Sequence, residues 1–186
     1  MVGVAPIDGK NCSGLTVAIV GAECSGKTTL ARALAQHFAA PWVPEYARDY
    51  LHGRTSYDED DVLAIAAGQR QTEANIADAN DLVFVDTDLV VIKIWHDVRF
   101  GGHNAWLDAA LHADLHADRP RRYLLTTPDI PWIADPLREN PFDRPALHAR
   151  YRPLLDLLGA KYVEVSGSRE QRLDRATGAV RGWLNR

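Results

Sequence analysis

The stretch LTVAIVGAECSGKTTLARALAQHF, residues 15–38, decides the fold. It begins with an unbroken apolar run over Leu15–Val20, which is typical of a strand buried on both faces of a parallel sheet. A glycine-containing loop follows, and then Ala and Leu recur at helical spacing. This order of strand, loop and helix predicts a phosphate-binding loop. The loop matches GxxxxGK[ST] at Gly21, Gly26, Lys27 and Thr28.

Each defined position of that pattern has a chemical task. The glycines let successive backbone N–H groups converge on phosphate oxygens at a helix N-terminus. Lys27 is expected to bridge the β- and γ-phosphates, and the Thr28 hydroxyl to hold Mg²⁺. We therefore expect a nucleoside triphosphate with Mg²⁺. The candidate nucleotide-binding residues of the loop are Gly21, Glu23, Cys24, Ser25, Gly26, Lys27, Thr28 and Thr29.

Short apolar runs alternate with helical patterns along the whole chain, which predicts a three-layer α/β fold with a five-stranded parallel sheet and helices on both faces. We expect residues 1–186 to form one domain, with residues 1–14 as an N-terminal tail. Ser56 and Glu59 have capping-box spacing before the second helix. The expected strands are Leu15–Val20, Trp42–Glu45, Leu82–Asp86, Tyr123–Thr127 and Tyr162–Val165. The helices are expected to begin at Gly26, Asp58, Leu89, Ala105, Arg144 and Arg169.

Composition excludes several classes of partner. The net charge is −4, and the 21 Lys and Arg residues are scattered rather than striped, which argues against nucleic acid. The longest apolar runs fall well short of the roughly 18–20 residues that cross a bilayer, and the N-terminus lacks the apolar region of a signal peptide. A cytoplasmic protein that binds small molecules is expected.

Carboxylates stand where two of the expected strands end. Glu45 closes the second strand, and Asp86 and Asp88 close the third, at the sheet edge where ligands of parallel α/β proteins bind. Phosphoryl transfer to a hydroxyl needs one carboxylate for the acceptor and one for the metal. Glu45 suits the first role and Asp86 the second, although the roles can be exchanged. Asp88 can equally cap the helix that follows.

Residues 128–144 break the alternation, because four prolines fall in the sixteen residues 128–143. A loop of this length is often an active-site lid. Arg138 and Arg144 in it can neutralise the transferred phosphoryl group, with Trp132 and Asp135 just before them. Equally, they can be solvated arginines of a surface loop.

Four segments together resemble one family. GAECSGKTTL, VPEYARDYL, LVFVDTDLV and PWIADPLREN occur in the order and at about the separations of the ribosylnicotinamide kinase domain of NadR-like proteins. The loop is generic, whereas Glu23, EYARDY, DTD and PWIAD are specific to that family. The resemblance covers about residues 15–165 and does not include the adenylyltransferase or DNA-binding domains. Cys24 departs from the small hydroxyl residue that is more usual there.

This resemblance implies a P-loop kinase fold, ATP with Mg²⁺ as donor, and nicotinamide riboside as acceptor. It assigns Glu45 and Asp86 to the acceptor hydroxyl and the metal, Arg138 and Arg144 to the lid, and Ser168 and Arg169 to the loop beside adenine. The pyridinium of the acceptor favours aromatic faces and carboxylates. The implied acceptor-binding residues are Glu45, Tyr46, Tyr50, Asp86, Asp88, Trp95, Trp132 and Asp135.

Two other functions remain open. A kinase of the same fold can act on another nucleoside or vitamin alcohol, and a regulatory module can bind ATP without turnover. A GTPase is disfavoured, because the fourth strand ends in LLTTPDI and offers no Asn-Lys pair to read guanine.

Overall fold

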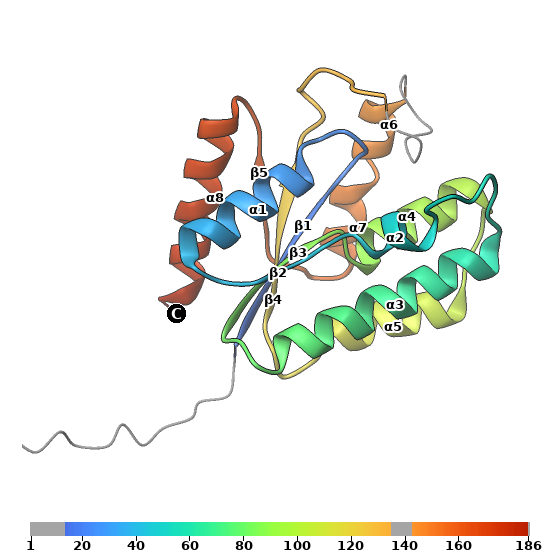
Figure 1. The fold of residues 1–186 in the computed structure, drawn as a ribbon, viewed down its shortest axis with the longest axis horizontal. Helices are drawn as coiled ribbons and strands as arrows, with labels where there is room; N and C mark the ends of the chain where they lie inside the picture. The colour runs from blue at the N-terminus through green and yellow to red at the C-terminus, as the bar shows by residue number, and fades with distance from the viewer. Residues whose placement is uncertain (1–13, 135–142, 186) are drawn as a thin grey trace, which may run out of the picture.

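The computed structural model describes residues 14–134 and 143–185, and a five-stranded parallel sheet lies at its centre (Figure 1). The strand order is β2-β3-β1-β4-β5, so the strand before the phosphate loop is central. The strands are β1 (Leu15–Gly21), β2 (Trp42–Val43), β3 (Leu82–Asp86), β4 (Arg121–Thr126) and β5 (Tyr162–Val165).

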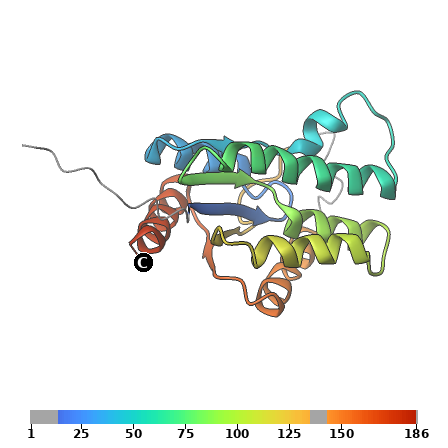
Figure 2. The same ribbon diagram turned by 90° about the horizontal axis from the view of Figure 1, so that it is seen from below.

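Helices cover both faces of the sheet, which confirms the predicted three-layer fold (Figure 2). One face packs against α1 (Lys27–Phe38) and α8 (Arg169–Leu184). The other packs against α3 (Glu59–Ala77), α4 (Leu89–Arg99), α5 (Ala105–Leu115) and α7 (Tyr151–Leu157). Two five-residue helices, α2 (Tyr46–Tyr50) and α6 (Arg144–His148), lie near the carboxyl edge of the sheet (Figure 1).

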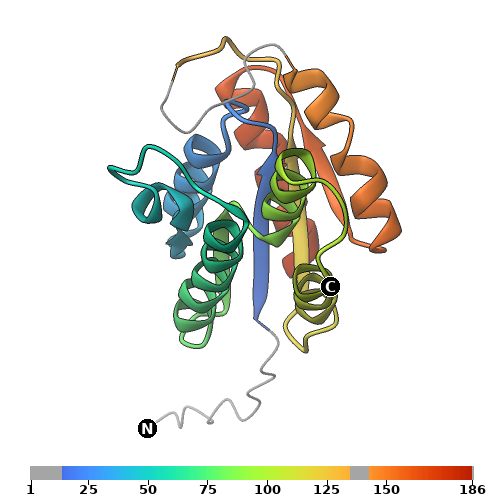
Figure 3. The same cartoon turned by 90° about the vertical axis from the view of Figure 1, so that its right-hand side faces the viewer.

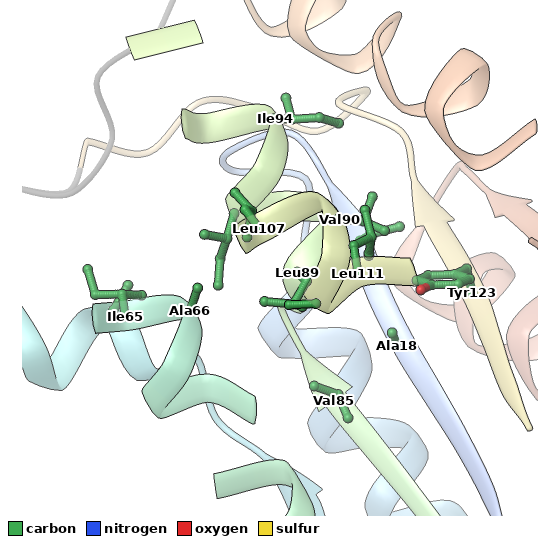
Figure 4. Close-up of a cluster of buried hydrophobic side chains, with 14 of the residues drawn as sticks. Ala18, Ile65, Ala66, Val85, Leu89, Val90, Ile94, Leu107, Leu111 and Tyr123 are labelled. Carbon is green, nitrogen blue, oxygen red and sulfur yellow. The ribbon is translucent and has the colours of Figure 1, made fainter. Parts of the chain in front are cut away.

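The alternation of side chains along the strands divides the core in two. Ala18 and Val85 lie on the face of the sheet that packs against Leu89 of α4 and Leu111 of α5 (Figure 4). Ile19 and its alternating neighbours face α1 and α8. All five of these side chains are at most 2% exposed. The sheet is therefore buried on both faces, and only its edges are available for a site.

The predicted strands and the structure differ mainly at β2. The prediction extended that strand to Glu45, whereas it ends at Val43. Pro44 has no backbone N–H to continue a ladder, and Glu45 instead becomes the N-cap of α2. The helices α2 and α7 were not predicted.

The predicted capping box at Ser56 and Glu59 is wrong. The box lies two residues later: Asp58 accepts from the Asp61 N–H at 3.0 Å, and the Asp61 carboxylate accepts from the Asp58 N–H at 3.1 Å. Asp is as good an N-cap as Ser, and the apolar stripe of α3 fits the later start.

The register brings the strand-end residues together. Ile19 of β1 pairs with Asp86 of β3, and Gly21 of β1 pairs with Thr126 of β4. The phosphate loop and the predicted carboxylate Asp86 therefore meet at one edge of the sheet. Figure 3 shows the chain after β4 passing above the same edge.

Candidate active site

The phosphate loop adopts the conformation that its glycines permit. Gly21 has φ 142°, and a Cβ there would lie 2.4 Å from Oγ1 of Thr126. Gly26 has φ 86° and is the N-cap of α1. The Ser25 hydroxyl bonds the Ala22 carbonyl at 2.7 Å and lies 2.6 Å from the Thr126 hydroxyl. These contacts hold the loop open above the first turn of α1.

Lys27 reaches back over this loop. Its ammonium donates to the carbonyls of Gly21 and Ala22, each at 3.0 Å. The same side chain lines both the hollow of about 110 Å³ over the loop and a larger adjoining cavity. The charge of Lys27 is thus positioned between the two spaces that a donor and an acceptor would fill.

Asp86 is a buried carboxylate without a hydrogen-bond partner among the described residues. It is 1% exposed, and neither of its oxygens is satisfied. Burial raises its pKa to about 6, and the charge of the Lys27 ammonium opposes this rise. A buried carboxylate beside the phosphate-loop threonine lowers the stability of the fold unless a cation binds to it.

Asp88 faces away from this centre. Thr87, between the two carboxylates, has φ 72°, a rare conformation for a β-branched residue. The Asp88 carboxylate accepts from the Val90 N–H at 2.9 Å, capping α4, and lies 3.5 Å from Arg121. Burial raises the pKa of Asp88 to about 6, and Arg121 opposes this rise. Of its two predicted roles, this geometry matches the helix cap and places Asp88 away from the lining of the acceptor cavity described below.

Glu45 lies where the loop hollow and the larger cavity meet, since it lines both. Its carboxylate pairs with Arg48 at 2.9 Å and its side chain is 21% exposed. A carboxylate in this position can reach a group in the cavity while remaining beside the phosphate loop. Asp86 is instead enclosed near Thr28.

The larger cavity, called here the acceptor cavity, has a volume of about 460 Å³. Glu23, Lys27 and Glu45 line its end at the phosphate loop. Apolar side chains of α4 form part of its walls, polar and charged groups contribute almost as much of the lining, and its far end is lined by Arg54, Tyr57, Trp95 and Arg99. Apolar walls combined with convergent polar groups are typical of a small-molecule site.

The predicted aromatic residues separate into two sets. Trp95 lines the acceptor cavity, and its indole N–H donates to the Tyr57 hydroxyl at 2.9 Å. Tyr46 packs on Gly68 of α3, and Tyr50 donates to Asp61 at 2.8 Å. Neither Tyr46 nor Tyr50 is among the residues that line the cavity.

Tyr57 and Tyr151 were missed by the sequence analysis, although both line the acceptor cavity. The Tyr151 hydroxyl donates to the Gly21 carbonyl at 2.9 Å and thereby joins α7 to the phosphate loop. No local motif marks either residue in the sequence.

The segment after β4 rests on the phosphate loop. Arg144 donates to the carbonyls of Cys24 at 3.3 Å and Ile130 at 2.9 Å, and its guanidinium lies 5.6 Å from the Trp132 ring centre. The Cys24 thiol contacts the Pro131 carbonyl at 3.4 Å. Of the other predicted lid residues, Asp135 and Arg138 lie outside the described residues, and the lid stays a prediction.

A smaller, mainly apolar hollow of about 100 Å³ lies on the opposite side of the phosphate loop. Gly26 and Thr29 line it together with Ile130 and the predicted residue Arg169. Ser168 instead caps α8, with its hydroxyl accepting from the Gln171 N–H. The loop hollow shares Gly26 and Thr29 with this smaller space and Lys27 and Glu45 with the acceptor cavity, so it adjoins both of them.

Arg172 was missed and joins the two sides of that smaller hollow. It is 4% exposed and donates to the carbonyls of Ser25 at 2.8 Å, Thr127 at 2.9 Å and Gly167 at 2.8 Å, and it also pairs with Asp129. The signal in the sequence is a basic residue four positions before Ala176 on the buried stripe of α8.

Replacing Arg172 by methionine should lower the unfolding free energy by about 2 kcal/mol or more, because three carbonyls lose a charged donor. ATP affinity should fall about 10-fold, since the phosphate loop and the smaller hollow lose their common support. Denaturant unfolding and calorimetric titration measure the two effects. Arg181→Met, at an exposed position of the same helix, is the control, and equal losses in both variants would contradict the assignment.

No cluster of three or more His, Cys, Asp or Glu side chains suited to a metal occurs among residues 14–134 and 143–185. No helix there combines the length and apolar character needed to span a membrane. The cytoplasmic location stays a prediction.

Comparison with known proteins identifies relatives of this chain. The family model described as AAA domain matches residues 16–172. The trifunctional NAD biosynthesis/regulator protein NadR of Salmonella typhimurium is 31% identical over 158 residues, which are 81% of this chain and 38% of that protein. The chain therefore spans well under half the length of this relative.

Solved structures agree with the sequence matches. A crystal structure of NadR protein in complex with NR superposes with a TM-score of 0.75 at 25% identity, covering 93% of this chain and 52% of that one. NadR protein in complex with NAD and AMP-PNP gives a TM-score of 0.71 at 22% identity, over 89% and 49% of the two chains. The predicted resemblance to NadR proteins and the P-loop fold are thereby confirmed.

Proposed function

Since the chain belongs to the AAA domain family, we propose that it is an ATP-dependent kinase that phosphorylates the ribose 5'-hydroxyl of nicotinamide riboside to give nicotinamide mononucleotide. The observation that carries this proposal is the junction of the phosphate loop with the acceptor cavity at Lys27 and Glu45. The NadR structure with bound NR supports the acceptor, and the AMP-PNP complex supports the donor.

In this proposal the three spaces hold one substrate pair. Adenine occupies the smaller hollow beside Arg169, the phosphates lie over the loop, and the riboside fills the acceptor cavity. As the oxygen of the acceptor hydroxyl bonds to the γ-phosphorus, Glu45 accepts the proton of that hydroxyl. The bond from that phosphorus to the β,γ-bridging oxygen breaks, and ADP leaves. Lys27 stabilises the charge on the phosphate oxygens.

The residues near Thr28 fit Mg²⁺. The two unsatisfied oxygens of Asp86 and the Thr28 hydroxyl are hard oxygen donors, which Mg²⁺ prefers. A magnesium site of this kind uses few protein ligands, because phosphate oxygens and water supply the others. Mg²⁺, when bound, neutralises phosphate charge. Asp86 and Thr28 would hold it directly or through water, which leaves Glu45 for the acceptor.

The far end of the acceptor cavity suits a pyridinium ring. Trp95 and Tyr57 form an edge-to-face pair with ring centres 5.0 Å apart, and both line the cavity. An aromatic face attracts a cationic ring. Trp95 is therefore the strongest of the predicted aromatic contacts for the acceptor, with Tyr57 added to it.

The test is ADP release against a panel of acceptors that includes nicotinamide riboside, nicotinic acid riboside, nucleosides and vitamin alcohols. We expect nicotinamide riboside to stimulate release far above the ATPase background. Stimulation by another acceptor alone would overturn the substrate. ATP binding with no acceptor-dependent release would favour a sensing module.

Replacing Glu45 by glutamine should lower kcat about 100-fold, because the general base is lost, while ATP affinity stays within about 3-fold. Steady-state kinetics and ATP titration measure these effects. Asp49→Asn, at an exposed position of α2, serves as the control. If ATP affinity falls instead, Glu45 and Asp86 have exchanged roles.

A further inference from the structure

Gln69 is the first polar residue on the buried stripe of α3, and Glu73 follows it on the same stripe. Gln69 comes after Val62, Ile65 and Ala66 on that stripe and is itself 1% exposed. It also lines the acceptor cavity. Burying a side-chain amide costs free energy unless both its N–H donor and its oxygen acceptor form hydrogen bonds.

Both ends of this amide bind backbone groups that flank Glu45. The Gln69 Oε1 atom accepts from the Tyr46 N–H at 2.8 Å, and Nε2 donates to the Pro44 carbonyl at 3.3 Å. One side chain from α3 therefore holds the chain immediately before and immediately after the proposed base.

The elements around Glu45 cannot hold it firmly by themselves. β2 has two residues and α2 has five, and helices this short are not stable alone. The Pro44 nitrogen has no hydrogen to donate. The position of the Glu45 carboxylate therefore depends on contacts from outside these elements.

We propose that Gln69 is a positioning residue, which sets the distance of the Glu45 carboxylate from the acceptor hydroxyl; this inference rests on the proposed function. Proton transfer requires hydrogen-bond reach, and a displacement of about 1 Å can cost about 100-fold in rate. A single amide does this because it offers a donor and an acceptor at fixed separation.

The first test is Gln69→Met, which keeps the length of the side chain and removes both hydrogen bonds. We expect kcat with nicotinamide riboside to fall about 10- to 100-fold, with the KM for ATP within about 2-fold of wild type. Gln71→Met is the matched control, because Gln71 lies on the same helix, is exposed and donates to Asn75 at 2.9 Å. Equal falls in kcat for the two variants would overturn the proposal.

A double-mutant cycle separates positioning from a general structural effect. In the Glu45→Gln background, Gln69→Met should lower kcat by less than about 2-fold more, because its effect acts through Glu45. Losses that multiply fully would overturn the proposal.

Hydrogen exchange of the Tyr46 amide gives a readout independent of activity. Exchange at this N–H should be faster in Gln69→Met and unchanged in Gln71→Met. Unchanged exchange in Gln69→Met would show that the anchor is absent. A wild-type protein that fails to turn over with any acceptor would defeat the proposed function, whereas this exchange would still test the anchor.

If Gln69→Met does not fold, Gln69→Glu takes its place. The introduced carboxyl group can donate to the Pro44 carbonyl only when protonated, and burial raises its pKa. Turnover relative to wild type should therefore be higher at about pH 6 than at about pH 8.5. A ratio that does not change with pH would overturn the proposal.

Discussion

Replacing Lys27 by alanine should lower kcat by about 1,000-fold or more, the largest loss expected from any single change in the phosphate loop. The ammonium lies between the loop hollow and the acceptor cavity, so its charge is available to the phosphoryl group throughout transfer. ATP affinity should fall as well, by about 10-fold. Single-turnover kinetics and ATP titration separate the two effects.

The fold should survive this change. The Lys27 side chain is partly exposed and bonds two loop carbonyls rather than the core, so the unfolding free energy should change by less than about 1 kcal/mol. Lys161→Ala, at an exposed position, is the control. Lys27→Arg should also lose most activity, because a planar fork does not replace a compact ammonium. A Lys27→Ala variant that unfolds would assign the lysine a structural role instead.

The parts of the site that could be predicted are those marked by local sequence. The phosphate loop and Asp86 lie at the ends of apolar runs that form β1 and β3 as expected. Glu45 was predicted as a candidate for the same reason, although its strand ends earlier, at Val43. Buried parallel strands have a strong sequence signature, and their carboxyl ends meet at one edge whatever the loops do.

The parts that could not be predicted depend on contacts distant in the chain. Gln69 acts on Pro44, 25 positions away, and Arg172 acts on Ser25, 147 positions away. Short helices such as α2 and α7 form because of such tertiary contacts rather than propensity. In the sequence, such a contact is indicated only by a polar residue on an apolar helical stripe. This pattern identifies a buried polar side chain but not the group that it binds.

Replacing Asp86 by asparagine should lower kcat by about 1,000-fold while making the metal-free protein more stable. The carboxylate is buried with both oxygens unsatisfied among the described residues, and a neutral amide costs less to bury than a charge. We expect the unfolding free energy to rise by about 1 kcal/mol or more, measured by denaturant unfolding with a chelator present. A lower unfolding free energy would mean that Asp86 supports the fold.

Asp88→Asn is the matched control, because Asp88 lies two positions away and is buried almost equally, at 3% exposed against 1% for Asp86. Asparagine keeps the cap of α4 but loses the charge that faces Arg121, which leaves Arg121 paired with Glu73. Because burial raises the pKa of Asp88 to about 6 as well, we expect the unfolding free energy to change by less than about 1 kcal/mol and kcat to stay within about 3-fold of wild type. A large loss of kcat in Asp86→Asn but not in Asp88→Asn would show that Asp86 is kept for a ligand. Equal losses of kcat in the two variants would contradict that division.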